Sequence, residues 1–155
     1  MFGLFQRKSA VRPVACPKTA KIGFVLGRLV SHWRASDSFV GAVGEDMPKQ
    51  MTPDGIEVAC DPNLMIGVTA GPTAFGIECA NFPAKDLAAT VAAVLTPGTV
   101  PDWAPDLGSD GGLCATLPLT DEAALRVTCL PCPVDPCFNN QRTAGARLIG
   151  HLQRV

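Results

Sequence analysis

Residues 56–80 read IEVACDPNLMIGVTAGPTAFGIECA, and this segment determines the predicted fold. It holds three apolar runs, at 56–60, 64–70 and 74–80, and each has the length of a single strand. The tripeptides Asp-Pro-Asn and Gly-Pro-Thr separate the runs, and both are rich in turn-forming residues. Short strands joined by tight turns predict an antiparallel meander.

Amphipathic helices are predicted on both sides of these strands. Residues 18–34 and 83–95 carry apolar side chains at a spacing near 3.6 residues. Pro83 suits the first position of the second helix, and Pro97-Gly98 ends it. We therefore expect helices that flank the sheet.

The remaining segments predict more strands and one more helix. Their expected positions are strands at 39–43, 113–117 and 125–130 and a helix at 139–155. That last helix is inferred from Ala144, Leu148, Leu152 and Val155, which lie on one face of a helix. Together the elements predict an α+β fold, with an antiparallel sheet of about five to six short strands flanked by two to three helices.

The chain of 155 residues has the length of one domain. Pro13 and Pro17 oppose helix formation near the start, so we predict an extended basic arm at 1–17 and a single α+β domain at 18–155. No run approaches the roughly 20 apolar residues that cross a membrane. Arg12 and Pro13 also interrupt the apolar run of a signal peptide. We expect a protein that is made in the cytoplasm and has no membrane partner.

The composition favours contact with other proteins. The chain is 47% hydrophobic and only 17% charged, whereas about 25% charged is typical. Apolar patches that stay exposed tend to be contact sites. The chain is therefore expected to be a homo-oligomer or part of a larger protein assembly. The alternative is a well-buried monomer with an alanine-rich core.

The net charge of −1 hides an uneven distribution. Residues 1–34 carry basic side chains and no acidic one, whereas all acidic side chains lie in residues 35–135. The basic arm has three alternative roles: it binds nucleic acid, it docks on an acidic neighbour, or it folds back on its own domain. The arm lacks interleaved aromatic residues and the pI is near 6.1, so nucleic acid is the least favoured.

The arm and a long loop supply the candidate partner-binding residues. They are Arg7, Lys8, Arg12 and Trp103. Trp103 lies in the middle of residues 96–112, a loop rich in proline, glycine and aspartate. The indole either anchors an interface or is tucked beneath its own loop, and both alternatives stay open.

The chain has seven cysteines, an odd number that cannot pair completely within one copy. Those in predicted strands are expected to be small buried hydrophobes: Cys60, Cys79, Cys114 and Cys129. The candidates for disulfides or contacts are Cys16, Cys129, Cys132 and Cys137. Cytosolic proteins keep thiols reduced. Virus particles escape this limit, because they are built in the cytosol and then persist in oxidising surroundings.

Cys129, Cys132 and Cys137 also form the one local cluster with metal-ligand spacing. Zinc would need a fourth ligand, for which the candidates are Cys114, Cys16 and His151. A redox dithiol is disfavoured, because the prolines after Cys132 oppose the helix that would lower its pKa. We therefore assign no metal and keep a zinc-stabilised binding module as an alternative.

No catalytic pattern is visible. His32 and His151 are the only histidines, and neither belongs to a recognised catalytic motif. The glycines near Gly71 lack the lysine of a phosphate-binding loop. We therefore predict no catalytic residue, no cofactor and no small-molecule substrate. A site whose residues meet only in the folded chain stays open as an alternative.

These observations favour a non-enzymatic structural or assembly protein. Its most specific form is a small phage particle component, such as a capsid-cement, neck or tail protein, that binds neighbouring subunits through its arm and loops. The predicted order of helix, strands, helix, strands and helix resembles that of the small secretion chaperones. This resemblance covers topology only and implies, as an alternative, a cytosolic partner-binding protein that acts as a dimer.

Overall fold

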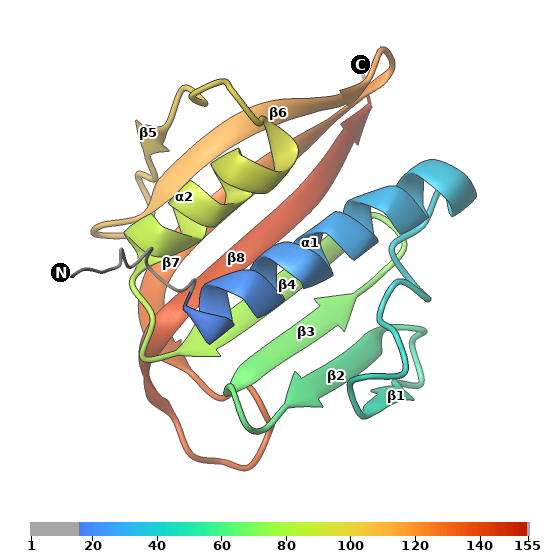
Figure 1. The fold of residues 1–155 in the computed structure, drawn as a ribbon, viewed down its shortest axis with the longest axis vertical. Helices are drawn as coiled ribbons and strands as arrows, with labels where there is room; N and C mark the ends of the chain where they lie inside the picture. Colours follow the sequence, from blue (N-terminus) through green and yellow to red (C-terminus); the bar gives the residue numbers. More distant parts are fainter. Residues whose placement is uncertain (1–15, 155) are drawn as a thin grey trace, which may run out of the picture.

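The structure is a computed structural model, and it describes residues 16–154. The predicted arm at 1–17 therefore lies almost entirely outside the described residues. The elements in chain order are α1 (Pro17–Ser36), β1 (Lys49–Met51), β2 (Glu57–Asp61), β3 (Ile66–Ala70), β4 (Ala74–Ala80), α2 (Ala84–Leu95), β5 (Ala104–Pro105), β6 (Leu113–Thr120), β7 (Ala123–Val134) and β8 (Thr143–Arg154). The predicted α+β class agrees with this content (Figure 1).

All strands belong to one antiparallel sheet of eight strands, in the order β1-β2-β3-β4-β8-β7-β6-β5. The meander predicted from residues 56–80 is confirmed as β2, β3 and β4. The last strand, β8, lies between β4 and β7 and joins the meander to the second half of the sheet (Figure 1). The chain end thus completes the centre of the sheet.

The predicted helix at 139–155 is wrong, because this segment forms β8. Ala144, Leu148 and Leu152 are four residues apart, which is an even interval, so they also lie on one face of a strand. Gly145 and Gly150 weaken a helix, and in the strand they make room for the backbone of Cys79 and the ring of Phe75. The structure therefore has more strands and fewer flanking helices than predicted. The resemblance to the topology of secretion chaperones included a last helix, and this helix is absent from residues 16–154.

The predicted strand at 39–43 is also wrong, since this segment is irregular. Its backbone N–H groups at Gly41 and Val43 donate to the buried carboxylate of Glu57, at 3.2 and 3.4 Å, instead of to a neighbouring strand. Phe39 of this apolar segment is fully buried and packs edge-on against Phe75, with ring centroids 5.0 Å apart. The sequence pattern therefore marked a core contact and not a strand.

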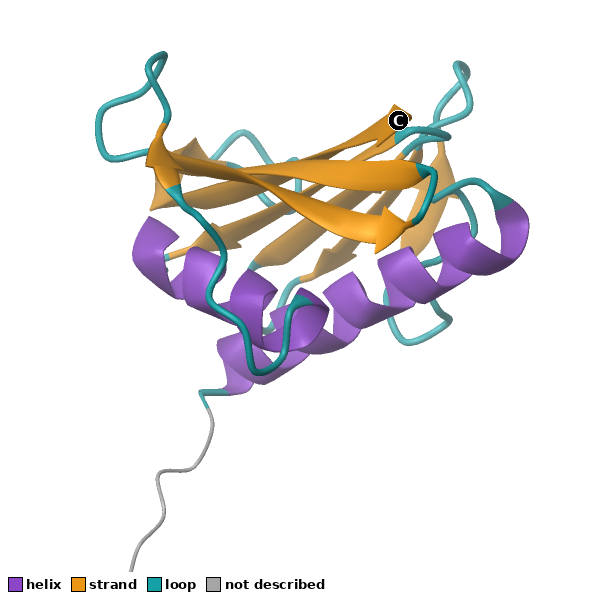
Figure 2. Cartoon of the chain, turned by 90° about the horizontal axis from the view of Figure 1, so that it is seen from above, coloured by secondary structure: helices purple, strands orange, loops and turns teal. Residues whose placement is uncertain are grey.

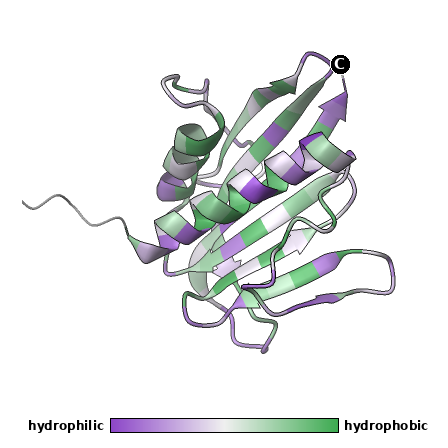
Figure 3. Ribbon diagram, turned by 45° about the vertical axis from the view of Figure 1, so that its right-hand side comes forward, coloured by the Kyte–Doolittle hydropathy of each residue, from purple (hydrophilic) through white to green (hydrophobic). Residues whose placement is uncertain are grey.

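Within residues 16–154, both helices cover the same face of the sheet, and the opposite face carries only loops (Figure 2). The strands alternate between apolar and polar side chains (Figure 3). Their apolar side chains form a core with the inner sides of the helices, represented by Leu26 and Leu87 on the helices and by Val68, Ile77 and Leu148 on the strands. None of the helices within residues 16–154 is both long and apolar enough to cross a membrane.

Candidate functional site

The face of the sheet without helices is the candidate site, and we call it the open face. It carries Thr69 on β3, Glu78 on β4 and Arg147 and Ile149 on β8. Their neighbours along each strand point to the buried core, as expected from the period of two. The register places Thr69, Gly76 and Ile149 side by side across three strands. Glu78 and Arg147 lie directly opposite each other in the same way.

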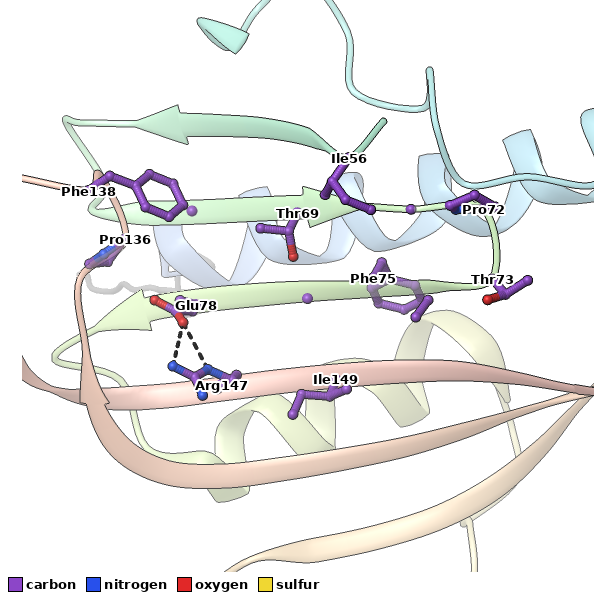
Figure 4. Close-up of a pocket in the computed structure, with 14 residues that line it drawn as sticks. Ile56, Thr69, Pro72, Thr73, Phe75, Glu78, Pro136, Phe138, Arg147 and Ile149 are labelled. Atoms are coloured by element: carbon purple, nitrogen blue, oxygen red, sulfur yellow. Dashed lines mark hydrogen bonds and ion pairs between the residues drawn. The ribbon is translucent and has the colours of Figure 1, made fainter. Parts of the chain in front are cut away.

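A hollow of about 370 Å³ lies on the open face over β3, β4 and β8, and we call it the trough (Figure 4). Gly76 in its floor has no side chain to fill it, and the backbone of Pro136 covers a second glycine, Gly67, at one end. Ile56, Phe138 and Ile149 line its sides with apolar surface. The trough is therefore an apolar hollow of a size that accepts one or two side chains or a small ligand.

One ion pair lines the trough, between the neighbouring strands β4 and β8. The Arg147 Nη2 and Nε atoms lie 2.7 and 2.8 Å from Glu78 Oε2 (Figure 4). The two side chains are 36% and 25% exposed, so solvent still reaches both. A pair of this kind fixes both side chains and cancels their charges. The trough therefore has one ordered polar side among apolar walls.

The loop between β7 and β8 folds onto one end of the trough. Its Cys137 forms a disulfide with Cys60 of β2, with a Cα–Cα distance of 5.3 Å. The backbone of Pro136 lies directly on Gly67, where any side chain would overlap it. The Asp135 carboxylate accepts hydrogen bonds from two backbone N–H groups of the same loop. These contacts hold Phe138, which is 57% exposed, at the rim of the trough.

The structure corrects the expected role of one cysteine. Cys60 was expected to be a buried hydrophobe, whereas it lies on the open face and is bonded to Cys137. It occupies a strand, and its partner comes from a loop far along the chain, so sequence spacing alone did not connect the two. The disulfide assigned to Cys137 is present, but its partner was not predicted.

The other cysteines do not converge on a common site. Cys16 is exposed, Cys132 is half-buried, and Cys79 and Cys129 are fully buried. Burial raises the pKa of the Cys79 thiol to about 11 and that of the Cys129 thiol to about 12. Both are therefore protonated and inert at neutral pH. Hydrogen bonds from the backbone of Thr19 and then of Lys18 lower the pKa of Cys16 below its ordinary value.

The proposed zinc ligands are not brought together. Cys137 is bonded to Cys60, and Cys129 and Cys132 are separated by an odd interval along β7, which puts them on opposite faces. Within residues 16–154, no group of three or more histidine, cysteine, aspartate or glutamate side chains is placed to hold a metal ion. The zinc alternative is therefore at odds with this arrangement.

Of the predicted partner-binding residues, Arg7, Lys8 and Arg12 lie outside the described residues. Trp103 is half-buried and packs against the core beneath its loop. That arrangement agrees with the tucked alternative, and its role in an interface stays a prediction. The loop at 96–112 contains the short strand β5, which the sequence did not indicate.

Sequence reasoning missed the trough for a specific reason. Its residues come from three strands, and β8, which supplies Arg147 and Ile149, was expected to be a helix. A usable signal was present in the spacing. Gly67 and Thr69 are two residues apart, as are Gly76 and Glu78, so each pair places a small and a polar residue on one face of a strand. Comparison of the chain with family models, curated proteins and solved structures found no match.

Proposed function

We propose that this chain is a non-enzymatic assembly protein that holds a protein partner against the open face of its sheet. The observation that carries the proposal is the one-sided cover, with both helices on one face and the apolar trough on the other. A solvated sheet face ordinarily carries polar side chains. Here Ile56, Phe138 and Ile149 present apolar surface, and such surface marks contact sites.

The edge strands of the sheet favour a partner that docks on the open face over one that adds a strand at an edge. The edge strands β1 and β5 span only Lys49–Met51 and Ala104–Pro105. The short β5 covers only Leu113 and Cys114 of β6, and Pro118, which has no N–H to donate, interrupts the uncovered part of that edge. A partner that packs on the open face instead covers side chains of several strands, as a second layer does in other sheet proteins.

The chemistry of the trough supports binding and not proton transfer. A general base needs a lone pair that is free to accept a proton from the substrate. Oε2 of the Glu78 carboxylate accepts both contacts from Arg147, whose charged guanidinium stabilises the ionised form, whereas Oε1 accepts no hydrogen bond within the described residues. The pair therefore holds the Glu78 side chain in place and leaves Oε1 as a polar contact for a partner.

The disulfide supports a setting outside the reducing cytosol. Bonds such as Cys60–Cys137 persist in oxidising surroundings and are rare in cytosolic proteins. A subunit that is made in the cytoplasm and then carried in a virus particle agrees both with synthesis in the cytoplasm and with a disulfide that persists in oxidising surroundings. We therefore propose, as the finer assignment, a phage capsid-cement, neck or tail component, and we expect its gene to lie among capsid or tail genes.

The proposal is tested by sedimentation velocity of the wild type and of Ile149→Lys. Ile149 is half-exposed, so the added ammonium reaches solvent and leaves the fold intact while it charges the trough. Phe24→Lys is the matched control, because Phe24 is 53% exposed on α1, on the other side of the sheet.

We expect the wild type and Phe24→Lys to associate and Ile149→Lys to sediment as a monomer. Far-ultraviolet circular dichroism of each variant verifies the fold. Equal association of all three proteins would show that the open face is not the binding surface.

A further inference from the structure

We infer that copies of this chain join head to tail, with the loop at 96–112 of one copy seated in the trough of the next. This inference rests on the proposed function and names the partner as a second copy. We call residues 96–112 the acidic loop. It contributes Leu107 as an apolar tip, and the trough supplies the receiving hollow.

The acidic loop exposes more apolar surface than its length requires. Leu107 is 100% exposed and Val100 is 87% exposed, the two highest values among the large hydrophobic residues of the part described. A fully exposed leucine at a loop tip has the form of an anchor that fills a pocket on a partner. Isolated exposed leucines are common, so exposure alone does not identify Leu107 as an anchor. The order and the charge of the loop support that role.

The tip of the loop is ordered before it meets a partner. The backbone N–H of Asp106 donates to Gly112 O at 2.9 Å, and Ser109 N donates to Asp106 O at 3.1 Å. Pairing of Ala104 with Cys114 in β5 and β6 ties the base of the turn to the sheet. Because the turn already holds Leu107 in place, little conformational entropy is lost when the side chain docks.

The loop is acidic, and an exposed arginine, Arg126, lies on the open face one strand away from the trough. The loop carries three aspartates and no basic residue: Asp102, Asp106 and Asp110. None of them belongs to an ion pair within the described residues. On the open face, Arg126 of β7 is exposed and is likewise outside those ion pairs, and its guanidinium donates a hydrogen bond to Cys114 Sγ at 3.6 Å.

Arg126 also lies on the open face, where its strand neighbour in β8 is His151, two residues after Ile149. Arg126 thus lies one strand away from the apolar wall of the trough at Ile149, and Asp106 directly precedes Leu107 in the loop. Complementary potentials of this kind fix the orientation of two surfaces and raise their rate of association.

The loop and the trough meet only between copies. The loop connects to β5 and β6 at one edge of the sheet, whereas the trough lies over β3, β4 and β8. Strands β7 and β6 separate β8 from that edge, at a spacing of about 4.8 Å for each strand. A contact between two different surfaces repeats from copy to copy and produces a ring or a filament.

A mixing experiment with two variants tests this contact. Leu107→Ser removes the tip and keeps the trough, and Ile149→Lys blocks the trough and keeps the tip. Each variant alone is expected to be monomeric by sedimentation velocity. An equimolar mixture is expected to form a 1:1 dimer and nothing larger, because it contains one intact tip and one intact trough for each pair.

Met51→Ser is the matched control, since Met51 is 55% exposed at the β1 edge and is expected to leave association unchanged. Association of Leu107→Ser like the wild type, or failure of the mixture to dimerise, overturns the head-to-tail contact. If only Ile149→Lys abolishes association, the inference falls and the proposed function stands. If neither variant affects association, the inference falls together with the open face as the binding surface. If the wild type is monomeric, the inference falls together with the self-association that the proposed function predicts.

Discussion

Removal of the Cys60–Cys137 disulfide should lower the free energy of unfolding by several kcal/mol. The bond joins residues that are 77 positions apart, so it restricts the unfolded chain strongly. The chain-entropy relation for a loop of 77 residues gives about 15 cal/mol/K, which is about 4.5 kcal/mol at room temperature. The folded loop keeps its contacts on Gly67 and at Asp135, so most of the loss arises in the unfolded chain.

Urea denaturation of Cys60→Ser/Cys137→Ser and of the wild type, followed by tryptophan fluorescence, measures this loss. The double variant should unfold at a lower midpoint and with a steeper dependence on urea, because its unfolded state is less compact. Cys132→Ser is the control, since Cys132 is a half-buried free cysteine of β7, the strand that leads into the loop of Cys137. A loss below about 1 kcal/mol would refute the reasoning that the bond constrains the unfolded chain.

Three further outcomes are expected. Gly67→Ala should lower the free energy of unfolding by about 1–3 kcal/mol in urea denaturation, since its methyl group overlaps the backbone of the β7–β8 loop; no loss would show that the loop yields freely. Mass spectrometry of alkylated native protein should find Cys16 modified first and Cys129 unmodified until denaturation, because their pKa values are lowered and raised respectively. The hydrogen bond from Lys21 lowers the pKa of Asp46, so Asp46→Asn should lower stability by less than about 1 kcal/mol at pH 7. That difference should fade as the pH falls below about 3.8, where the carboxylate takes up its proton.

Local patterns predicted the elements that depend on local chemistry. The turns that bound residues 56–80 and the apolar spacing of both helices identified β2, β3, β4, α1 and α2 to within a few residues. The strand β8 could not be recognised in the same way. Its apolar residues fit either period, and its burial depends on β4 and β7, which flank it from distant parts of the chain.

The candidate site was harder to predict than the fold, because it exists only between strands. Ile149 and Thr69 become neighbours through the register of β3, β4 and β8, and no sequence spacing indicates this. The same is true of Cys60 and Cys137. Composition did indicate a surface with exposed apolar groups, and the exposed Leu107 and Phe138 fit that expectation.

The central claim is that the open face of the sheet is covered by another copy in the working protein. The most direct test is the solution mass of the full chain by light scattering over a series of concentrations. The account predicts a mass that rises above the 16.2 kDa of one chain as concentration increases. A mass of 16.2 kDa at every concentration would contradict it.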